Sequence, residues 1–534
     1  MGEKGKYLLL AAASAVLLSV PFLVPFAGWV ALIALVPLLW LERIYKGKRF
    51  WWWHYGTFVL WNALTTFWVC NATVGGGIFA VLANALQMSV VFALFRWSRR
   101  RFSGSVPYIF LALAWIAWER WYFGTQISWP WLTLGHAFAQ STGLVQWYEF
   151  TGTLGGSLWV WAANLSVFGL ICALREGFWG EWNVKAKSAA IAGTVTVILA
   201  PMAVSAAIYS SFEEEGTPRE VAIVQPNFDP YQKFQSMSQA GQNAIFLDLA
   251  AKALKDRKGD STAAPLLLLA PETFTGDVVT NDIPSGATFR RFHGFLQDYP
   301  GVDVIFGASA WTRIDSSERP SRTARRIDDG QWVESHNSAL VTDASGRYEI
   351  FHKSKLVVGT ELTPYPAIFV PIDDALGGVM GRCVGQDEIS CLHLGDGTPI
   401  GCAICYESVY GEYCTGYVRK GAQALCVITN DAWWGDTPGY RQHLSYSRLR
   451  AIETRRDIAR CANTGISAII DQRGRIVSQT PWWEPATLRG EIHLRDGQTF
   501  FVRNGDIVGR LCSFLFLLLL LALLVRTLRG DYSK

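Results

Sequence analysis

The sequence carries little net charge and no recognisable metal-binding pattern. Its 48 Lys and Arg residues nearly balance 44 Asp and Glu residues, leaving a formal net charge of +4. This charge is too small to indicate nucleic-acid binding, and the basic residues cluster beside apolar runs instead of forming a stripe. The ten cysteines include no paired CxxC motifs and no histidines at metal-ligand spacing. We therefore expect no nucleic-acid partner, no metal ion and no cofactor.

The sequence is rich instead in long apolar runs, which lie towards both ends of the 534-residue chain. These runs predict seven transmembrane helices in residues 1–210, an extracytoplasmic domain in residues 211–506, and an eighth transmembrane helix with a cytoplasmic tail in residues 507–534. The predicted spans are Tyr7–Leu23, Ala27–Leu41, Trp52–Val69, Ile78–Phe95, Pro107–Tyr122, Leu154–Leu174, Ala189–Tyr209 and Ile507–Val525.

Basic residues set the predicted orientation of these spans. Lys4 and Lys6 precede the first span, and Lys or Arg residues follow the second, fourth, sixth and eighth spans. The loops Val24–Phe26 and Cys70–Gly77 carry neither. Because loops rich in Lys and Arg stay in the cytoplasm, the domain between spans seven and eight is expected outside it. The aromatic loop Phe123–Thr153 is either an interfacial belt or a lipid-facing platform beneath that domain.

Strand and helix patterns alternate through the extracytoplasmic region. Short apolar runs rich in β-branched residues predict strands, and Gly346 marks a hairpin turn. The pattern predicts an α/β fold, a sheet sandwich with helices outside. The predicted strands are Glu220–Gln225, Pro265–Ala270, Val302–Ala310, Ser338–Thr342, Tyr348–His352, Ile400–Cys405, Ala424–Thr429 and Ile466–Ile470, and the predicted helices are Gln239–Lys255, Thr288–Gln297, Val409–Gly421 and Gln442–Thr454.

One cysteine stands where a predicted strand turns into a predicted helix. The apolar run that starts at Pro399 breaks at Cys405, and Glu407 or Ser408 is placed to cap the helix that follows. Backbone N–H groups of such a turn would lower the pKa of the thiol and hold an oxyanion. The alternative is an inert thiol in the core. We interpret Cys402, Cys426 and Cys461 as such core thiols.

Two further residues with catalytic potential follow other predicted strands. Glu272 comes after an apolar strand through Pro271, and a carboxylate at a strand end is placed to act as a general base. Lys353 ends the hairpin strand, where its charge would stabilise an oxyanion beside it. Taken singly, Glu272 could cap a helix and Lys353 could face solvent. All three at strand ends of one domain indicate a shared site with Cys405 as nucleophile.

These segments resemble the Glu, Lys and Cys motifs of the nitrilase, or carbon–nitrogen hydrolase, superfamily. Further stretches are similar to its membrane-bound branch, the apolipoprotein N-acyltransferases, as is the eight-span plan. The segments that carry the resemblance are Ala270–Thr273, Lys353, Cys405–Glu407, Val224–Asn227, Val427–Trp433 with Gly435–Asp436, Gln442–His443, Arg460–Gly465 and Gly505–Asp506.

The resemblance implies an α-β-β-α domain and a two-step reaction in a bacterial inner membrane. An acyl chain from a glycerophospholipid would be held as a thioester and passed to the N-terminal amine of a diacylated apolipoprotein. The enzyme would contact membrane lipids and act as a monomer. The resemblance assigns the base to Glu272, the oxyanion partner to Lys353, the nucleophile to Cys405, auxiliary roles to Glu361, Tyr406 and Glu407, and substrate or lid contacts to Phe234, Trp433 and Trp434.

Several alternatives remain open at the level of sequence. A membrane-anchored amidase that uses water as the acceptor would share the same three residues. A lipid-binding protein without catalysis is disfavoured because Glu272, Lys353 and Cys405 are all intact. Trp433 and Trp434 fit an interfacial anchor as well as a lid, and Val358–Thr360 departs from the loop that many relatives place before the auxiliary glutamate. Cys383 and Cys391 either form a disulfide with each other or remain unpaired thiols.

Overall fold

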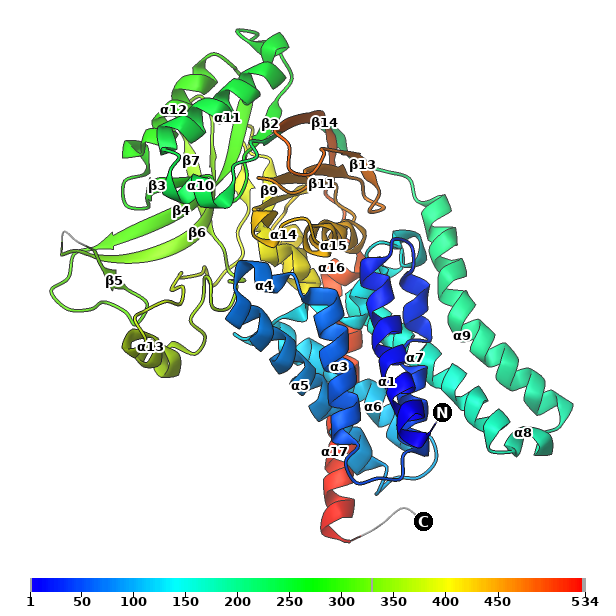
Figure 1. Ribbon diagram of the computed structural model, residues 1–534. Coiled ribbons are helices and arrows are strands. Elements are labelled where there is room, and N and C mark those ends of the chain that lie inside the picture. The colour runs from blue at the N-terminus through cyan, green and yellow to red at the C-terminus, as the bar shows by residue number, and fades with distance from the viewer. Residues whose placement is uncertain (1, 328–329, 531–534) are drawn as a thin grey trace. The chain divides into compact units, whose positions relative to one another are not determined.

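A computed structural model of the protein describes residues 2–327 and 330–530 (Figure 1). The side chains of residues 231, 234 and 235 lie outside the described ones, so the predicted role of Phe234 cannot be placed in the structure. The chain forms two compact units: Met1–Phe212 together with Asn504–Lys534, and Glu213–Arg503. Each unit is described by itself.

The first unit is helical. Within the described residues, five of its helices are long and apolar enough to cross a membrane: α1, α5, α7, α9 and α17. The helices α3 and α6 are shorter, with 16 and 18 residues, so a total of eight spans stays a prediction. The helices of this unit are α1 (Glu3–Leu23), α2 (Val36–Ile44), α3 (Trp51–Thr66), α4 (Val69–Ala72), α5 (Val74–Ser98), α6 (Val106–Phe123), α7 (Tyr148–Arg175), α8 (Phe178–Glu181), α9 (Val184–Ser211) and α17 (Ile507–Leu528).

The predicted span Ala27–Leu41 is wrong as a single helix. The chain forms a 3-10 helix, η1 (Gly28–Leu32), and then starts α2 at Val36 with a proline in its first turn. Proline has no N–H to donate and its ring crowds the preceding turn, which favours a break there. Asn164 of α7 bridges the break, because its side chain accepts from Leu35 N at 2.7 Å and donates to Ala31 O at 2.8 Å.

The aromatic loop between α6 and α7 packs within the helical unit. It contains three short 3-10 helices, η2 (Pro130–Leu132), η3 (Leu134–Phe138) and η4 (Thr142–Leu144). Trp131 is fully buried, and Trp129 stacks on it with ring centroids 5.1 Å apart. Glu119 accepts from Leu134 N at 2.8 Å, and Arg120 lies 3.9 Å from Asp506. Glu119 and Arg120 therefore have separate partners.

The described residues of the second unit form two β-sheets. One has eight strands in the order β14-β1-β2-β4-β6-β5, with β3 beside β4 and β7 beside β6, and the other has the order β13-β12-β11-β10-β9-β8. The strands are β1 (Thr217–Gln225), β2 (Leu266–Leu269), β3 (Thr275–Val279), β4 (Val302–Ile314), β5 (Arg325–Arg326), β6 (Trp332–Thr342), β7 (Tyr348–His352), β8 (Leu392–His393), β9 (Pro399–Ile404), β10 (Ala424–Thr429), β11 (Ile458–Ala462), β12 (Ala468–Ile470), β13 (Ile476–Gln479) and β14 (Ala486–Leu494).

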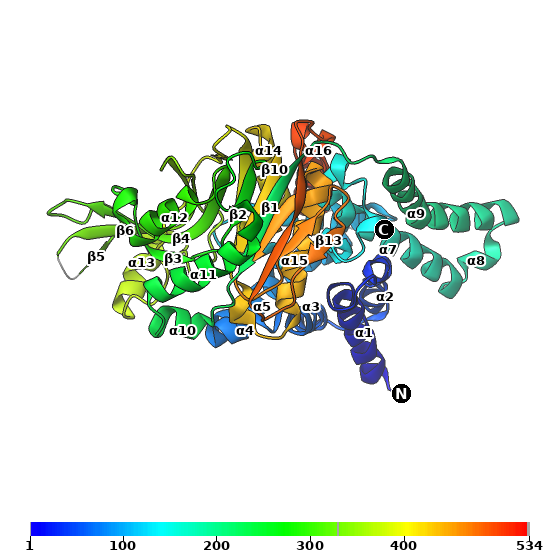
Figure 2. The same cartoon turned by 90° about the horizontal axis from the view of Figure 1, so that it is seen from above.

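Helices cover the outer faces of the paired sheets. Figures 1 and 2 show α11 and α12 along the eight-stranded sheet and α14 and α15 along the other, giving four layers, α-β-β-α. The helices of this unit are α10 (Pro230–Gln235), α11 (Gln239–Ala253), α12 (Ala287–Gln297), α13 (Pro366–Ala375), α14 (Gly411–Arg419), α15 (Pro438–Thr454) and α16 (Phe500–Asn504), whose last residue falls in the first unit; short 3-10 helices are η5 (Lys255–Arg257), η6 (Ile283–Ser285), η7 (Cys405–Val409) and η8 (Asp431–Trp434).

The layers explain why the strands have continuous apolar sequences. On β1, Val221 and Ile223 belong to the core that joins both sheets, whereas Ala222 and Val224 belong to the core beneath α11 and α12. A strand buried on both faces has no polar alternation. The hairpin predicted at Gly346 is confirmed by the antiparallel pairing of β6 with β7, and the helix predicted to start at Val409 begins two residues later.

Candidate active site

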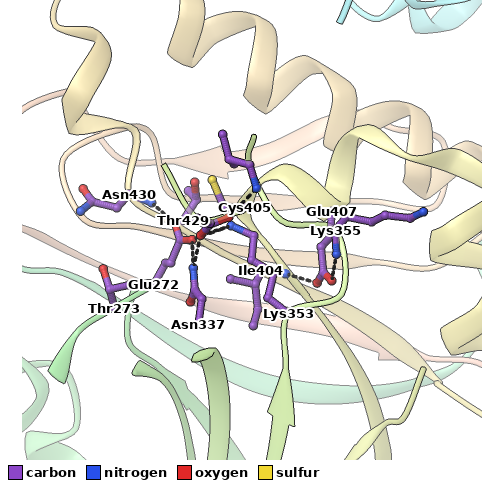
Figure 3. A network of polar contacts seen from close by, with 12 residues as sticks. Glu272, Thr273, Asn337, Lys353, Lys355, Ile404, Cys405, Glu407, Thr429 and Asn430 are labelled. Carbon is purple, nitrogen blue, oxygen red and sulfur yellow. Dashed lines mark hydrogen bonds and ion pairs between the residues drawn. The ribbon is translucent and has the colours of Figure 1, made fainter. Parts of the chain in front are cut away.

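The three predicted residues at strand ends meet in one site (Figure 3). Glu272 follows β2, Lys353 follows β7 and Cys405 follows β9. Glu272 is 5% exposed and Lys353 is 1% exposed, while Cys405 is half-buried. The first two come from the eight-stranded sheet and the third from the six-stranded sheet, so the packing of the sheets assembles the site.

Lys353 is shared between two carboxylates. Its Nζ lies 3.0 Å from Glu272 Oε1 and 2.9 Å from Glu361 Oε1. Asn337 of β6 donates to the same two oxygens, each at 2.7 Å, and the backbone N–H of Asn430 donates to Glu272 Oε2 at 3.0 Å. Sequence reasoning missed Asn337, since a polar residue inside a strand carries no local signal of its partners.

The pKa values of Lys353 and Cys405 are both raised, for different reasons. Burial lowers the pKa of Lys353, but Glu272 and Glu361 outweigh it and hold this pKa well above its usual value. Burial raises the pKa of the Cys405 thiol well above its usual value, and Glu272 raises it further, while Lys353 opposes both. The expected lowering of the thiol pKa by the turn is therefore wrong. The resting thiol is neutral and needs a base before it can attack.

The backbone at Cys405 is left-handed, with φ at +51°. A residue with a side chain rarely adopts this region, which marks the turn as a constrained one. The strand continues into the 3-10 helix η7 before α14 begins. Neither predicted cap binds the start of α14. Ser408 Oγ donates to Cys405 O at 2.8 Å, and Glu407 Oε2 accepts from Ile404 N at 2.8 Å.

Glu407 connects the backbone beside the lysine to the backbone beside the cysteine. It is fully buried, and its Oε1 accepts from Ser354 N at 2.7 Å and from Tyr413 OH at 2.7 Å. Its Oε2 accepts from Ile404 N at 2.8 Å. Figure 3 shows this carboxylate on the side of the site away from Glu272. Glu407 thus fixes the chain directly after Lys353 relative to the chain directly before Cys405.

Tyr406 packs against the turn. Its side chain is buried, and its ring meets that of Tyr410 edge to face with centroids 5.2 Å apart. Glu407 supplies polar contacts to two strand ends, and Tyr406 supplies an aromatic contact within the turn.

The turn that carries Glu272 is shaped by two residues that sequence reasoning did not select. A Cβ on Gly307 of β4 would lie 2.5 Å from the Cα of Glu272, so this position requires glycine. Buried Lys233 donates to Thr273 O at 2.5 Å, and Thr273 has a left-handed φ of +47°. Burial lowers the pKa of Lys233 to about 7, with the charge of Glu272 opposing the change. No local sequence pattern indicates that Gly307 or Lys233 shapes the turn at Glu272.

The two predicted lid tryptophans lie in η8. Trp433 is 36% exposed, whereas Trp434 packs its ring against His443 with centroids 5.5 Å apart. Cys383 and Cys391 carry free thiols in the described part of the chain, and Cys391 is buried in the core, where its thiol donates to Tyr417 O. The disulfide alternative is therefore wrong.

Three potential metal ligands, one of them the Cys405 thiol, lie close together. One ligand atom each from Cys405, Asp431 and His443 lies within 4.8 Å of the others. Asp431 already binds His443 through one oxygen and Arg460 through the other, at 2.9 Å and 2.6 Å. A cation would have to displace this arginine, so the donor set fits a hydrogen-bonded network better than a metal centre.

Comparison with known proteins gives consistent matches along the chain. The carbon-nitrogen hydrolase family matches residues 172–500, and the apolipoprotein N-acyltransferase N-terminal domain matches residues 14–166. A Chlorobaculum tepidum relative named apolipoprotein N-acyltransferase is 28% identical, covering 93% of this chain and 95% of its own. A Pseudomonas aeruginosa relative of the same name is 27% identical, and the match covers 100% of this chain and 98% of the relative. A solved structure of Saccharomyces cerevisiae Nit3, of the nitrilase superfamily, is 14% identical over 53% of this chain and 92% of its own, with a TM-score of 0.36.

We expect the Cys405 thiol to react with iodoacetamide only at high pH. Because burial and Glu272 disfavour the thiolate, the alkylation rate should rise with a midpoint above pH 9. Replacing Glu272→Gln removes a negative charge beside the sulfur, so the midpoint should move to lower pH. Mass spectrometry of the Cys405 peptide measures the rate against pH. A wild-type midpoint near 8, or an upward shift in Glu272→Gln, would contradict this electrostatic account.

Replacing Glu407→Gln should loosen the backbone on both sides of the site. Glutamine places an NH2 group where the carboxylate accepted from Ser354 N and Ile404 N, so at least one buried N–H loses its acceptor, at a cost of about 1–3 kcal/mol. Amide hydrogen exchange should become roughly 10- to 100-fold faster in peptides that contain these two residues. The exposed Glu412→Gln serves as the control. Unchanged exchange in both peptides of Glu407→Gln would rule out the proposed connection.

Proposed function

Since the chain belongs to the carbon–nitrogen hydrolase family, we propose that it transfers an acyl chain from a glycerophospholipid to the N-terminal amine of a diacylated apolipoprotein. The observation that carries this proposal is the assembly of Glu272, Lys353 and Cys405 in one buried site. The full-length relatives and the matched N-terminal domain support lipoprotein N-acylation as the activity.

The first half-reaction forms a thioester. Glu272 accepts the proton of the Cys405 thiol, and the sulfur attacks the carbonyl carbon of the phospholipid ester. The negative charge that develops on the carbonyl oxygen is stabilised by the ammonium of Lys353, which its carboxylate neighbours keep charged. The carbon–oxygen bond then breaks, and Glu272 returns the proton to the departing lysophospholipid oxygen.

The second half-reaction uses the same groups in the same order. The neutral amine of the apolipoprotein attacks the thioester carbonyl, and Glu272 accepts a proton from the amine nitrogen. Lys353 again faces the oxyanion, and the carbon–sulfur bond breaks as the amide forms. The proton on Glu272 passes to the cysteine thiolate, which restores the resting site. Two bulky lipids can thus use one site in turn.

The remaining substrate contacts follow from position and exposure. Trp433 is exposed two residues after Asp431, near the nucleophile's network, and we assign it a substrate contact. Trp434 packs on His443 and supports that loop. Phe234, whose side chain lies outside the described ones, stays a proposed substrate or lid residue, and we propose that the enzyme acts as a monomer.

The membrane arrangement proposed here has eight crossings in a bacterial inner membrane, with the catalytic unit on the periplasmic side. Five long apolar helices support several of these crossings. The broken segment formed by η1 and α2 counts as one crossing, because Asn164 satisfies its backbone groups at the break. The catalytic unit lies in the chain between α9 and α17, and the distribution of Lys and Arg supports a position of that connection outside the cytoplasm.

A membrane-anchored amidase is the second candidate. The same three residues would hydrolyse an amide with water as the acceptor, and nothing in their geometry separates the two reactions. The match of residues 14–166 to the N-terminal domain of apolipoprotein N-acyltransferases favours acyl transfer to an amine.

Incubation of the purified enzyme with phospholipid alone should load one acyl chain onto Cys405. Without an amine acceptor the thioester accumulates, so intact-protein mass spectrometry should show one added acyl mass that neutral hydroxylamine removes. Cys405→Ala should show none. Glu272→Gln should form the adduct roughly 100- to 10,000-fold more slowly, the usual contribution of general base catalysis.

The conservative control is Cys414→Ala, which removes another buried thiol of the same unit. It should still load the acyl chain. If Cys405→Ala still acylates a diacylated lipopeptide, Cys405 is not the nucleophile. If the loaded enzyme releases only free fatty acid when the lipopeptide is added, the amidase is the better description.

A further inference from the structure

A buried histidine hydrogen-bonds the backbone carbonyl of Cys405, and the proposed acyl-transfer steps do not use this histidine. His443 of α15 has a side chain with no exposed surface. Its Nε2 lies 3.0 Å from the carbonyl oxygen of Cys405 and 3.1 Å from Ser408 Oγ. A carbonyl oxygen can only accept, so Nε2 carries the hydrogen and donates it. Ser408 Oγ donates to the same carbonyl at 2.8 Å.

Asp431 fixes the orientation of this histidine. His443 Nδ1 lies 2.9 Å from Asp431 Oδ1, which also accepts from Thr429 Oγ1 at 2.8 Å. Arg460 binds Asp431 Oδ2 at 2.6 Å, and its Nη2 lies 3.3 Å from His443 Nδ1. Burial raises the pKa of Asp431, but Arg460 and His443 outweigh it and leave this pKa below its usual value. The carboxylate therefore stays ionised and accepts hydrogen bonds from Thr429 and Arg460.

The segment that contains Asp431 also contacts the other reacting groups. Thr429, which donates to Asp431 Oδ1 at 2.8 Å, also opposes the rise in the pKa of the Cys405 thiol. Asn430 N donates to Glu272 Oε2 at 3.0 Å (Figure 3). The last residue of β10 and the two residues after it thus act on the thiol, the base and the histidine.

The conformation of Cys405 gives these contacts their importance. Its left-handed φ of +51° is unfavourable for a residue with a side chain, and such a conformation persists only where its surroundings impose it. Hydrogen bonds from His443 and Ser408 to its carbonyl supply that constraint. Because His443 binds the Cys405 carbonyl and Asp431 binds His443, both residues act through the position of Cys405.

We propose that Asp431 and His443 are positioning residues, which hold the Cys405 backbone in the conformation that presents its thiol to Glu272. This inference rests on the proposed function only in taking Cys405 as the nucleophile. A thiol that moves by about 1 Å loses its alignment with the base and with the ester carbonyl, and misplacement on this scale lowers rates by roughly 100-fold.

The test measures the reactivity of Cys405 without any lipid. The maximal rate of iodoacetamide alkylation at high pH is followed on the Cys405 peptide in the full-length enzyme. His443→Phe and Asp431→Asn should lower this rate roughly 10- to 100-fold. His443→Gln should recover most of it, because its amide nitrogen takes the place of Nε2. With phospholipid, the same variants should lower the rate of thioester formation by a similar factor and leave KM unchanged.

Two control variants separate position from stability. Leu444→Ala removes a core side chain from the same helix without a contact to the carbonyl, so it should lower the thermal unfolding midpoint and leave the alkylation rate unchanged. His493→Gln alters another Asp–His pair, since His493 Nδ1 lies 2.9 Å from Asp457, and should also leave the rate unchanged.

Equal alkylation rates in wild type, His443→Phe and Asp431→Asn would overturn the inference, as would an equal loss in Leu444→Ala. If His443→Phe does not fold, the other two variants decide: a slow Asp431→Asn beside a fast His443→Gln supports the inference, and equal rates overturn it. A wild-type enzyme with normal alkylation but no acyl transfer to a lipopeptide would contradict the proposed function and leave the positioning role intact.

Discussion

The ion pairs of Lys353 with Glu272 and Glu361 are the interaction on which the site depends. One buried ammonium faces two carboxylates at 3.0 Å and 2.9 Å, so the cluster has an excess of negative charge. A buried charge is stable only when it is paired and hydrogen-bonded, and Asn337 and the backbone of Asn430 provide the additional donors. Burial and the charge of Glu272 together raise the pKa of the Cys405 thiol and keep it neutral in the resting site.

The site requires both sheets in their packed arrangement. Glu272, Asn337 and Lys353 stand on the eight-stranded sheet, and Cys405 with the segment after β10 stands on the other. Glu407 connects the two sides through backbone N–H groups, and Asp431 with His443 connects Cys405 to α15. The polar network is therefore continuous from the outer helix layer to Glu272, and each member limits the movement of the next.

Sequence reasoning predicted the catalytic candidates because they stand where strands end. Apolar runs that finish at Pro271, His352 and Ile404 identify Glu272, Lys353 and Cys405, and the structure brings these together. The α/β class was predictable because strands that are buried on both faces have continuous apolar sequences. The longest helices were predictable because their apolar runs are long enough to cross a membrane.

Other features depend on long-range contacts and could not be predicted. Asn337 and Lys233 are ordinary polar residues until the fold places them beside Glu272 and Thr273. The predicted strands do not include β11, because Arg460 interrupts its apolar sequence. In the fold this arginine binds the buried Asp431. The break before α2 depends on Asn164 of a distant helix. The pKa of Cys405 was predicted in the wrong direction because burial and Glu272 outweigh the backbone N–H groups of the turn.

The most direct test of the central claim is a single-turnover transfer from isolated acyl-enzyme. The enzyme loaded on Cys405 is freed of phospholipid and mixed with a diacylated lipopeptide, with an N-acetylated copy of the peptide as the control. The account predicts that the acyl mass leaves Cys405 and appears on the peptide amine at the same rate, with no transfer to the acetylated peptide. Release of the acyl chain as free fatty acid at equal rates with both peptides would contradict it.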